Sequence, residues 1–345
     1  MQTPTYLRPV ELARIAHVTK GAVSQATKAE QKRDLLVEKN GKVMGLTPEY
    51  AEKYLSRRET ASMLYHSAAF VLSTQTGGAG KTSSCISLAA AARRITDRSR
   101  AIVMVDSDSQ ASLTMQTTGK VAPDDVPVLR DWVEGRSSID ELLVRVGDEA
   151  ENLWVIRSNL QNIYLDRALQ RGTQIKTQGL KLFRAIFDHF GRGTKIFVDT
   201  PPQLSNFGTS CIAAGAQMPE SCYLMIPIRL DLFGRAGAKI CLGEARECCE
   251  TYGLDPSRLR SVCYFSNYDQ RTKVSMGALR AVMADESLGA YLAPVSIRYS
   301  TEIPRASSER RSVFHSFDVA VSGVGRDYTE LLLTTLGWSV PEGND

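Results

Sequence analysis

Short apolar runs alternate with longer amphipathic segments from residue 68 onward, which is typical of an α/β protein. Parallel strands need crossover connections, so this alternation predicts a mostly parallel, doubly wound sheet with helices between its strands. Ligand chemistry is expected at the carboxyl ends of such strands. The candidate strands are Ala68–Ser73, Ala101–Asp106, Leu153–Ile156, Thr194–Asp199, Tyr223–Ile228 and Leu259–Phe265.

The first 58 residues have a different pattern. Residues 9–16 and 22–28 each predict a short helix, and the turn between them contains Gly21. Apolar runs on both sides of Asn40-Gly41 predict two strands joined by a tight turn, and Thr47-Pro48 predicts the start of another helix. This order indicates a small winged helix-turn-helix-like domain. A helical domain used for dimerisation or docking has the same pattern.

These patterns divide the chain of 345 residues into a helix-turn-helix domain over 1–58, a linker over 59–67 and an α/β domain over 68–345. In a helix-turn-helix, side chains near the start of the second helix reach bases and phosphates. The candidate DNA-contacting residues of this domain are Ser24, Gln25, Lys28, Lys32 and Arg33.

The positive charge is concentrated in the N-terminal segment. Residues 1–66 hold eleven Lys/Arg and seven Asp/Glu, so their net charge of +4 equals that of the whole chain. A local excess of this kind favours a nucleic-acid-binding module. No apolar run reaches the ~20 residues of a membrane span, and seven cysteines without a C-x-x-C pair favour reduced thiols, so a cytoplasmic protein is expected.

A glycine-rich loop follows the first strand of the α/β domain. Its sequence, Thr76-Gly77-Gly78-Ala79-Gly80-Lys81-Thr82, fits the phosphate-binding pattern x-G-G-x-G-K-[ST]. Glycines let several backbone N–H groups point at one phosphate, and the helix that follows presents its positive end there. Lys81 is expected on the β/γ-phosphates and the Thr82 hydroxyl on Mg²⁺. The predicted ligands are therefore ATP and Mg²⁺, held by residues 77–83 including Ser83.

Two later strands end in carboxylates. The second strand runs into Asp106-Ser107-Asp108, and the fourth runs into Asp199-Thr200-Pro201-Pro202. An Asp at a strand end beside a phosphate loop can hold Mg²⁺ directly or through water, so Asp106 and Asp199 join Thr82 as candidate metal ligands. We expect Asp108 to orient the attacking water, and Lys81 and Asp108 are the candidate catalytic residues.

Together these motifs resemble the ParA/MinD group of P-loop ATPases, in particular the ParA-type partition ATPases, over about residues 68–335. The Asp-x-Pro-Pro motif is intact, whereas Ser109 replaces the proline of the family's Asp-x-Asp-Pro-Gln motif. The resemblance implies that Asn267, after a late strand, helps to hold adenine. Residues 297–306 resemble the family's next characteristic block.

The loop departs from the family at its first position, where Thr76 stands in place of a signature lysine. In the family that lysine reaches the phosphates of a partner across an ATP-bound dimer. We therefore expect ATP binding to be retained, while hydrolysis is slow or depends on another cation, such as Arg235 or an arginine of a partner subunit.

The resemblance also implies partners. They are a second copy of the chain, DNA bound without sequence preference, and a centromere-binding ParB-like protein, with a nucleoid-associated location and no membrane. The basic residues expected to contact DNA near the C-terminal end are Arg305, Arg310 and Arg311.

Three functions fit the sequence. The first is a partition ATPase that segregates plasmid or chromosomal DNA and also represses its own operon. The second is an ATP-binding but hydrolysis-poor DNA-binding regulator or adaptor, which Thr76 and the helix-turn-helix pattern favour. The third is a metabolic or metal-delivery enzyme on the same fold, for which a basic N-terminal module has no clear use.

Overall fold

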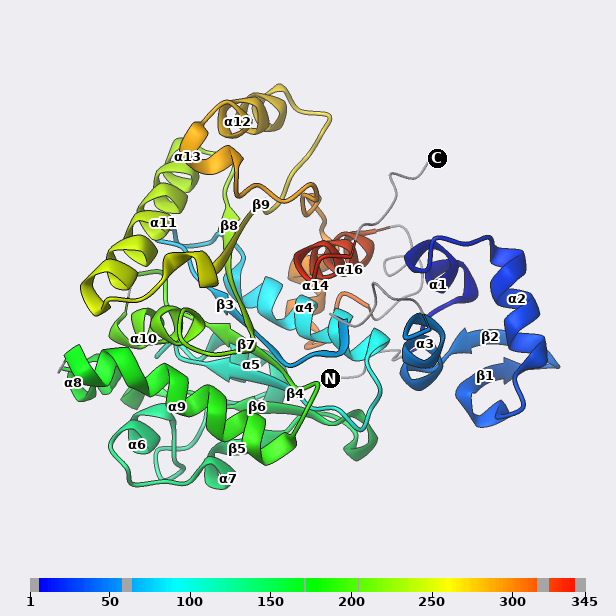
Figure 1. The fold of residues 1–345 in the computed structure, drawn as a ribbon, viewed down its shortest axis with the longest axis horizontal. Helices are drawn as coiled ribbons and strands as arrows, with labels where there is room; N and C mark the ends of the chain where they lie inside the picture. Colours follow the sequence, from blue (N-terminus) through cyan, green and yellow to red (C-terminus); the bar gives the residue numbers. More distant parts are fainter. Residues whose placement is uncertain (1–5, 58–63, 171, 204, 315–322, 339–345) are drawn as a thin grey trace.

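The computed structural model describes residues 6–57, 64–170, 172–203, 205–314 and 323–338. Its main sheet has seven strands in the order β5-β6-β4-β7-β3-β8-β9 (Figure 1). Every neighbouring pair is parallel except β5 with β6. The strands are β3 (Ala68–Leu72), β4 (Ile102–Asp106), β5 (Leu143–Arg145), β6 (Leu153–Ile156), β7 (Lys195–Asp199), β8 (Ser221–Ile228) and β9 (Arg260–Phe265).

All six predicted strands are present within two residues of their predicted ends, and the predicted α/β class is confirmed. The short edge strand β5 was not predicted. The central strand β3 is buried on both faces, as its unbroken apolar sequence requires. Its side chains alternate, so Phe70 and Leu72 belong to one hydrophobic core, and Ala69 and Val71 belong to the other.

Helices cover both faces of the sheet (Figure 1). On one face α4 packs against β3, β4 and β7, with α16 alongside it, and on the other α10 and α11 pack against the sheet with α9 over α10. The helices of this part are α4 (Lys81–Ile95), α5 (Ser112–Thr118), α6 (Leu129–Val133), α7 (Ile139–Leu142), α8 (Leu165–Ala168), α9 (Gly172–Phe190), α10 (Asn206–Gly215), α11 (Leu232–Tyr252), α12 (Lys273–Met283), α13 (Glu286–Gly289), α14 (Glu302–Ser308) and α16 (Val324–Thr335).

The N-terminal unit, residues 6–57, contains α1 (Pro9–Ile15), α2 (Lys20–Ala29), the antiparallel strands β1 (Leu36–Lys39) and β2 (Lys42–Leu46), and α3 (Pro48–Leu55). Asn40 and Gly41 both have positive φ angles, 53° and 71°, as a tight hairpin turn of the predicted kind requires. The Thr47 hydroxyl accepts from the Tyr50 N–H and caps α3 as predicted. The second helix begins at Lys20, two residues before its predicted start, because the Thr19 hydroxyl caps it.

The N-terminal unit is joined to the α/β part by buried contacts. One hydrophobic core includes Leu12 of α1, Leu88 of α4 and Leu331 of α16. Within it the carboxylate of Glu11 accepts from the guanidinium of Arg94 at 2.8 Å, and both side chains are almost fully buried. The predicted boundary at residues 59–67 therefore does not separate two cores. Residues 58–63 of that predicted linker lie outside the described residues.

No described helix is long and apolar enough to cross a lipid bilayer.

Candidate functional site

The glycine-rich loop lies between the carboxyl end of β3 and the first turn of α4. Gly78 and Gly80 have φ angles of +68° and +83°, where a side chain would be strained. Residues 77–83 line one side of a cavity of about 390 Å³, and α4 presents its N-terminus to it. The loop thus has the backbone freedom and the positive helix end that anion binding needs. All seven residues predicted to bind nucleotide in this loop lie at the cavity.

Thr82 lines this cavity and contacts Asp199, although the two residues are far apart in sequence. The Thr82 hydroxyl donates to Asp199 Oδ2 at 2.7 Å, while Asp199 Oδ1 is buried with no hydrogen-bond partner among the described residues. Burial, followed by the neighbouring Asp106 carboxylate, raises the pKa of Asp199 to about 8. A buried carboxylate with one unused oxygen beside a threonine hydroxyl fits a Mg²⁺ site, because Mg²⁺ prefers oxygen ligands and lowers the cost of ionising the acid.

Asp106 has a different environment. Its Oδ2 accepts from the N–H and the hydroxyl of Thr114, its Oδ1 accepts from the Asp108 N–H, and the side chain is fully buried. Burial raises its pKa to about 7. Asp106 thus uses both of its oxygens to organise the loop from Asp106 to Thr114, and its role as a metal ligand stays a prediction. Asp108 does line the cavity, where a water-orienting role was predicted.

Lys81 is the buried cation of the cavity. Desolvation lowers the pKa of its ammonium group, and Asp199 and Asp108 act in the opposite direction. Its burial means that much of its hydration is already lost. A bound phosphate group would supply the negative charge that this position favours.

The rest of the wall comes from several other segments, some of them in the last 80 residues. Asn267, predicted to hold adenine, lines the cavity and has a φ of +58°. Several wall residues were not predicted, namely Ser112, Gln116, Thr200, Pro202, Ser266, Ile297, Ile303 and Tyr328. Ile297 and Ile303 lie in the block that resembles the family, so the sequence did carry a signal for them. Tyr328 carried none, since its place depends on how α16 packs on α4.

The first half of the loop is bonded to α11 and to the segment between β8 and α11. The Gln75 amide donates to Glu244 at 2.6 Å, and the Thr76 hydroxyl donates to the Phe233 carbonyl at 3.2 Å. The Gly77 carbonyl accepts from Arg229 at 3.0 Å. The arginine that the structure brings to the loop is thus Arg229, whereas Arg235, the predicted substitute for the signature lysine, makes no described contact with it.

The predicted DNA-contacting residues lie in two places. In the N-terminal unit, Ser24 is half-buried and the others are exposed, and Arg33 forms an ion pair with Glu38. Near the C-terminal end all three predicted arginines are exposed. Arg305 and Arg311 both pair with Glu309. Surface ion pairs of this kind are weak and leave an arginine free to exchange partners.

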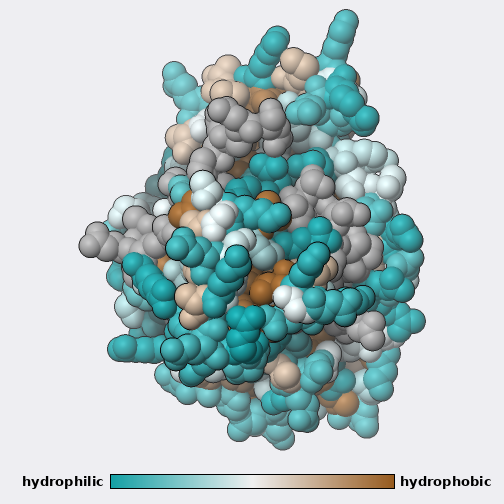
Figure 2. All heavy atoms as spheres, turned by 90° about the vertical axis from the view of Figure 1, so that its right-hand side faces the viewer, coloured by the Kyte–Doolittle hydropathy of each residue, from teal (hydrophilic) through white to brown (hydrophobic). Residues whose placement is uncertain are grey.

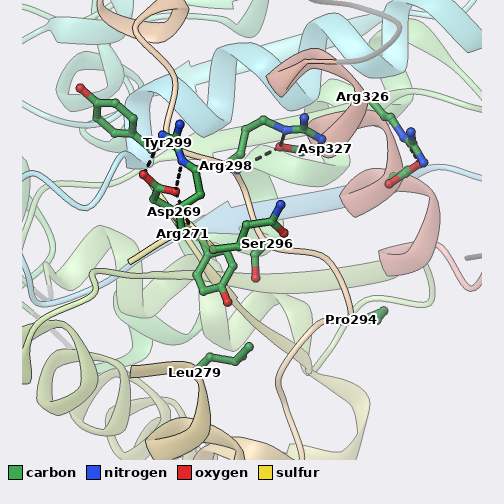
Figure 3. Close-up of a pocket in the computed structure, with 12 residues that line it drawn as sticks. Asp269, Arg271, Leu279, Pro294, Ser296, Arg298, Tyr299, Arg326 and Asp327 are labelled. Atoms are coloured by element: carbon green, nitrogen blue, oxygen red, sulfur yellow. Dashed lines mark hydrogen bonds and ion pairs between the residues drawn. The ribbon is translucent and has the colours of Figure 1, made fainter. Parts of the chain in front are cut away.

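A larger cavity, of about 660 Å³, lies beside the first, between the segments 268–271 and 294–299 and helix α16 (Figure 3). Each of its three arginines is paired with a carboxylate of the same cavity, as Arg298–Asp327, Arg271–Asp269 and Arg326–Glu330. Such self-paired charges favour neither a cation nor an anion. The smaller cavity carries the more specific chemistry, and we place the functional site there.

Comparisons with known proteins agree with this geometry. The family model for AAA domains, AAA_31, matches residues 68–252. No curated protein matches the chain significantly.

Solved structures show the same fold. An ATP complex of a McdA variant from Cyanothece has a TM-score of 0.64 and 17% identity, covering 81% of this chain and 99% of that one. A cobyrinic acid a,c-diamide synthase from Mycobacterium smegmatis with an ATP analogue and magnesium has a TM-score of 0.57 and 20% identity, covering 77% and 93%. A putative plasmid partition protein from Borrelia burgdorferi bound to AMPPNP has a TM-score of 0.55 and 16% identity, covering 78% and 97%.

The family match covers more than half of the chain and includes the loop, both strand-end carboxylates and the strands that hold them. The chain therefore belongs to the AAA_31 family of AAA domains and has the fold of ParA/MinD-type P-loop proteins.

Proposed function

We propose that this protein is a partition-type ATPase that binds ATP and Mg²⁺, dimerises and, in that state, binds DNA without sequence preference. The observation that carries the proposal is the cavity at the glycine-rich loop, which Lys81 and Thr82 line and next to which Thr82 bonds to the buried Asp199. Structurally similar proteins were solved with ATP, or with an ATP analogue and magnesium, which supports the same ligands here.

In this proposal the chain's own residues have distinct tasks. Lys81 binds the β/γ-phosphates, and the N–H groups of residues 77–83 cradle them. Thr82 and Asp199 hold Mg²⁺, which neutralises charge that develops on the phosphates. Asp108, at the rim of the cavity, orients the attacking water. Asn267 holds the adenine.

Positive charge supports a role in DNA binding. The residues available for phosphate contacts are the exposed Arg305, Arg310 and Arg311 near the C-terminal end and Gln25, Lys28 and Lys32 in the N-terminal unit. Hydrophilic residues dominate the side of the molecule that carries this unit (Figure 2). We propose that the N-terminal unit binds an operator, and that the other arginines bind bulk DNA as a cargo is positioned with a ParB-like partner.

One observation favours a second function. Thr76 occupies the position of the signature lysine, is buried, and donates its hydroxyl to Phe233 within its own chain. A hydrolysis-poor, ATP-gated DNA-binding regulator would need no cation at that position.

DNA binding with different nucleotides separates these functions. A partition ATPase should bind random-sequence duplex with Mg-ATP but much less with Mg-ADP, and the affinity should fall steeply as salt rises. A regulator should prefer one operator sequence, and its hydrolysis should equal that of Lys81→Ala but increase in Thr76→Lys. Equal binding of random duplex with ATP, with ADP and without nucleotide would refute the proposal.

A further inference from the structure

Arg229 extends from the end of β8 to the glycine-rich loop. One guanidinium nitrogen donates to the Gly77 carbonyl at 3.0 Å and lies 4.0 Å from where a Cβ on Gly78 would be. The other nitrogen pairs with Asp231 at 2.7 Å. Both glycines line the nucleotide cavity, so this guanidinium contacts a residue of the cavity wall.

Asp231 fixes where the arginine points. One oxygen of its carboxylate accepts from the Gly234 N–H at 2.7 Å and caps α11, while the other holds Arg229. Helix α11 is long and packs on β8. Asp231 is thus held at the start of α11, while the exposed ion pair leaves the guanidinium able to exchange a partner.

The side chain of Arg229 is still 43% exposed, and its described hydrogen bonds use two of the five N–H donors that a guanidinium has. A guanidinium stays protonated at all physiological pH values and can bind two phosphate oxygens at once. Arg229 can therefore bond to a phosphate in the loop without giving up Asp231.

We propose that Arg229 supplies the second cation of the phosphate site and takes over the charge of the signature lysine that Thr76 replaces. This inference rests on the proposed ATPase function. When ATP is bound, the guanidinium exchanges its bond with the Gly77 carbonyl for one with the terminal phosphate. The cation then comes from the strand β8 side of the same chain.

The contacts of Thr76 agree with this assignment. Its hydroxyl is bound to Phe233, and Gly237 lies so close that a Cβ there would be 2.3 Å from that hydroxyl oxygen. The position of the signature lysine is thus packed against α11. Among the described residues, Arg229 is the cation that bonds to this half of the loop.

The test compares affinities for Mg-ADP and for a non-hydrolysable Mg-ATP analogue. Arg229→Ala should weaken binding of the analogue about tenfold more than binding of ADP, because one charge-assisted contact with the terminal phosphate is lost. ATP hydrolysis should fall by about 100-fold or more. Arg229→Lys should recover part of the analogue affinity. Arg246→Ala, which removes an exposed arginine of α11 far along the same helix, should leave both affinities unchanged.

If Arg229→Ala weakened the binding of ADP and of the analogue equally, or changed neither affinity, the inference would be overturned. The arginine would then only stabilise the loop or pair with Asp231. Failure of Arg229→Lys to recover any preference for the analogue would also contradict it. A wild-type chain that binds neither nucleotide would refute the proposed function and this inference with it. Wild-type hydrolysis that is unchanged in Arg229→Ala would refute this inference alone.

Discussion

The two halves of the glycine-rich loop differ in what holds them. In the second half Lys81 and Thr82 face the cavity, and Asp199 leaves one buried oxygen without a partner among the described residues. In the first half Gln75, Thr76 and Gly77 are each bonded to the segment from Arg229 to Glu244. The second half has polar groups that can bind a ligand. In the first half, the polar groups named here are already hydrogen-bonded to other parts of the protein.

This difference between the two halves indicates that they contribute differently to nucleotide binding and to hydrolysis. Buried polar atoms without partners are costly, and they persist where a ligand completes them. The second half is thus suited to binding Mg-nucleotide. The first half instead packs against α11. In our proposal Arg229 supplies the positive charge that the family's signature lysine would supply at position 76. Binding and hydrolysis should therefore respond differently to substitutions in the two halves.

The largest effect is expected in the second half. Lys81→Ala should weaken Mg-ATP binding by about 100-fold or more, because the phosphates lose a desolvated ammonium partner and nothing replaces its charge. Titration calorimetry measures this affinity. Lys273→Ala, at an exposed lysine outside the cavity, is the control and should bind like wild type. An unchanged affinity in Lys81→Ala would place the nucleotide elsewhere.

The pH dependence of Mg²⁺ binding comes next. The pKa values of Asp199 and Asp106 are raised to about 8 and about 7, so both acids become protonated as the pH falls through neutrality. Metal binding requires the carboxylate of Asp199, so Mg²⁺ affinity measured with bound nucleotide should rise about 50-fold from pH 6 to pH 8 and level off above about pH 9.

The same shifts affect stability without Mg²⁺. Between about pH 4 and pH 8 the folded chain binds more protons than the unfolded chain, so the free energy of unfolding should decrease as the pH rises through this range. Denaturant unfolding at several pH values measures it. Asp199→Asn removes one of the two titrating groups and should flatten the slope. A slope as steep as that of wild type would show that Asp199 ionises normally.

A smaller effect, on stability, is expected where Thr76 packs against α11. Gly237→Ala would place a Cβ 2.3 Å from the Thr76 hydroxyl oxygen, so it should cost about 1–3 kcal/mol of stability. The next contacts of that Cβ, with the Thr76 nitrogen and Cβ, are 3.5 and 3.6 Å, which is ordinary packing. Thr76→Ala should therefore remove most of the cost, and a double-mutant cycle from denaturant unfolding measures this coupling.

Gly243→Ala is the matched control for that cycle. Gly243 lies in the same helix, and a Cβ there meets nothing within 4 Å. The substitution should stabilise the protein by up to about 1 kcal/mol, because alanine is the better helix former. If Gly237→Ala behaves like Gly243→Ala, Thr76 is not packed against α11.

Much of the fold and the second half of the loop could be predicted from sequence, because the signals are local. Apolar strands, Gly-Lys-Thr before a helix and Asp199 at a strand end each occupy a few consecutive residues. The structure confirms the six strands, and it brings the glycine-rich loop to a cavity and Thr82 into contact with Asp199. The hydrogen bond between Asp106 and Thr114 could not be predicted, because it depends on the path of the loop between them.

Features that depend on distant pairs could not be predicted. The bonds from the first half of the loop reach residues more than 150 positions away, and nothing in the local pattern marks Arg229 as the donor to the Gly77 carbonyl. Likewise, the Glu11–Arg94 ion pair places the N-terminal unit on α4, where composition indicated a separate domain. The edge strand β5 has three residues, too few for its pattern to be distinguished from a loop.

Steady-state ATP hydrolysis by the purified chain, with and without random-sequence duplex DNA and beside Lys81→Ala, tests the central claim most directly. The account predicts turnover by the wild-type chain that DNA increases and that Lys81→Ala abolishes. A wild-type rate that stays at the Lys81→Ala background with DNA present would contradict the partition-ATPase function and leave a nucleotide-gated regulator.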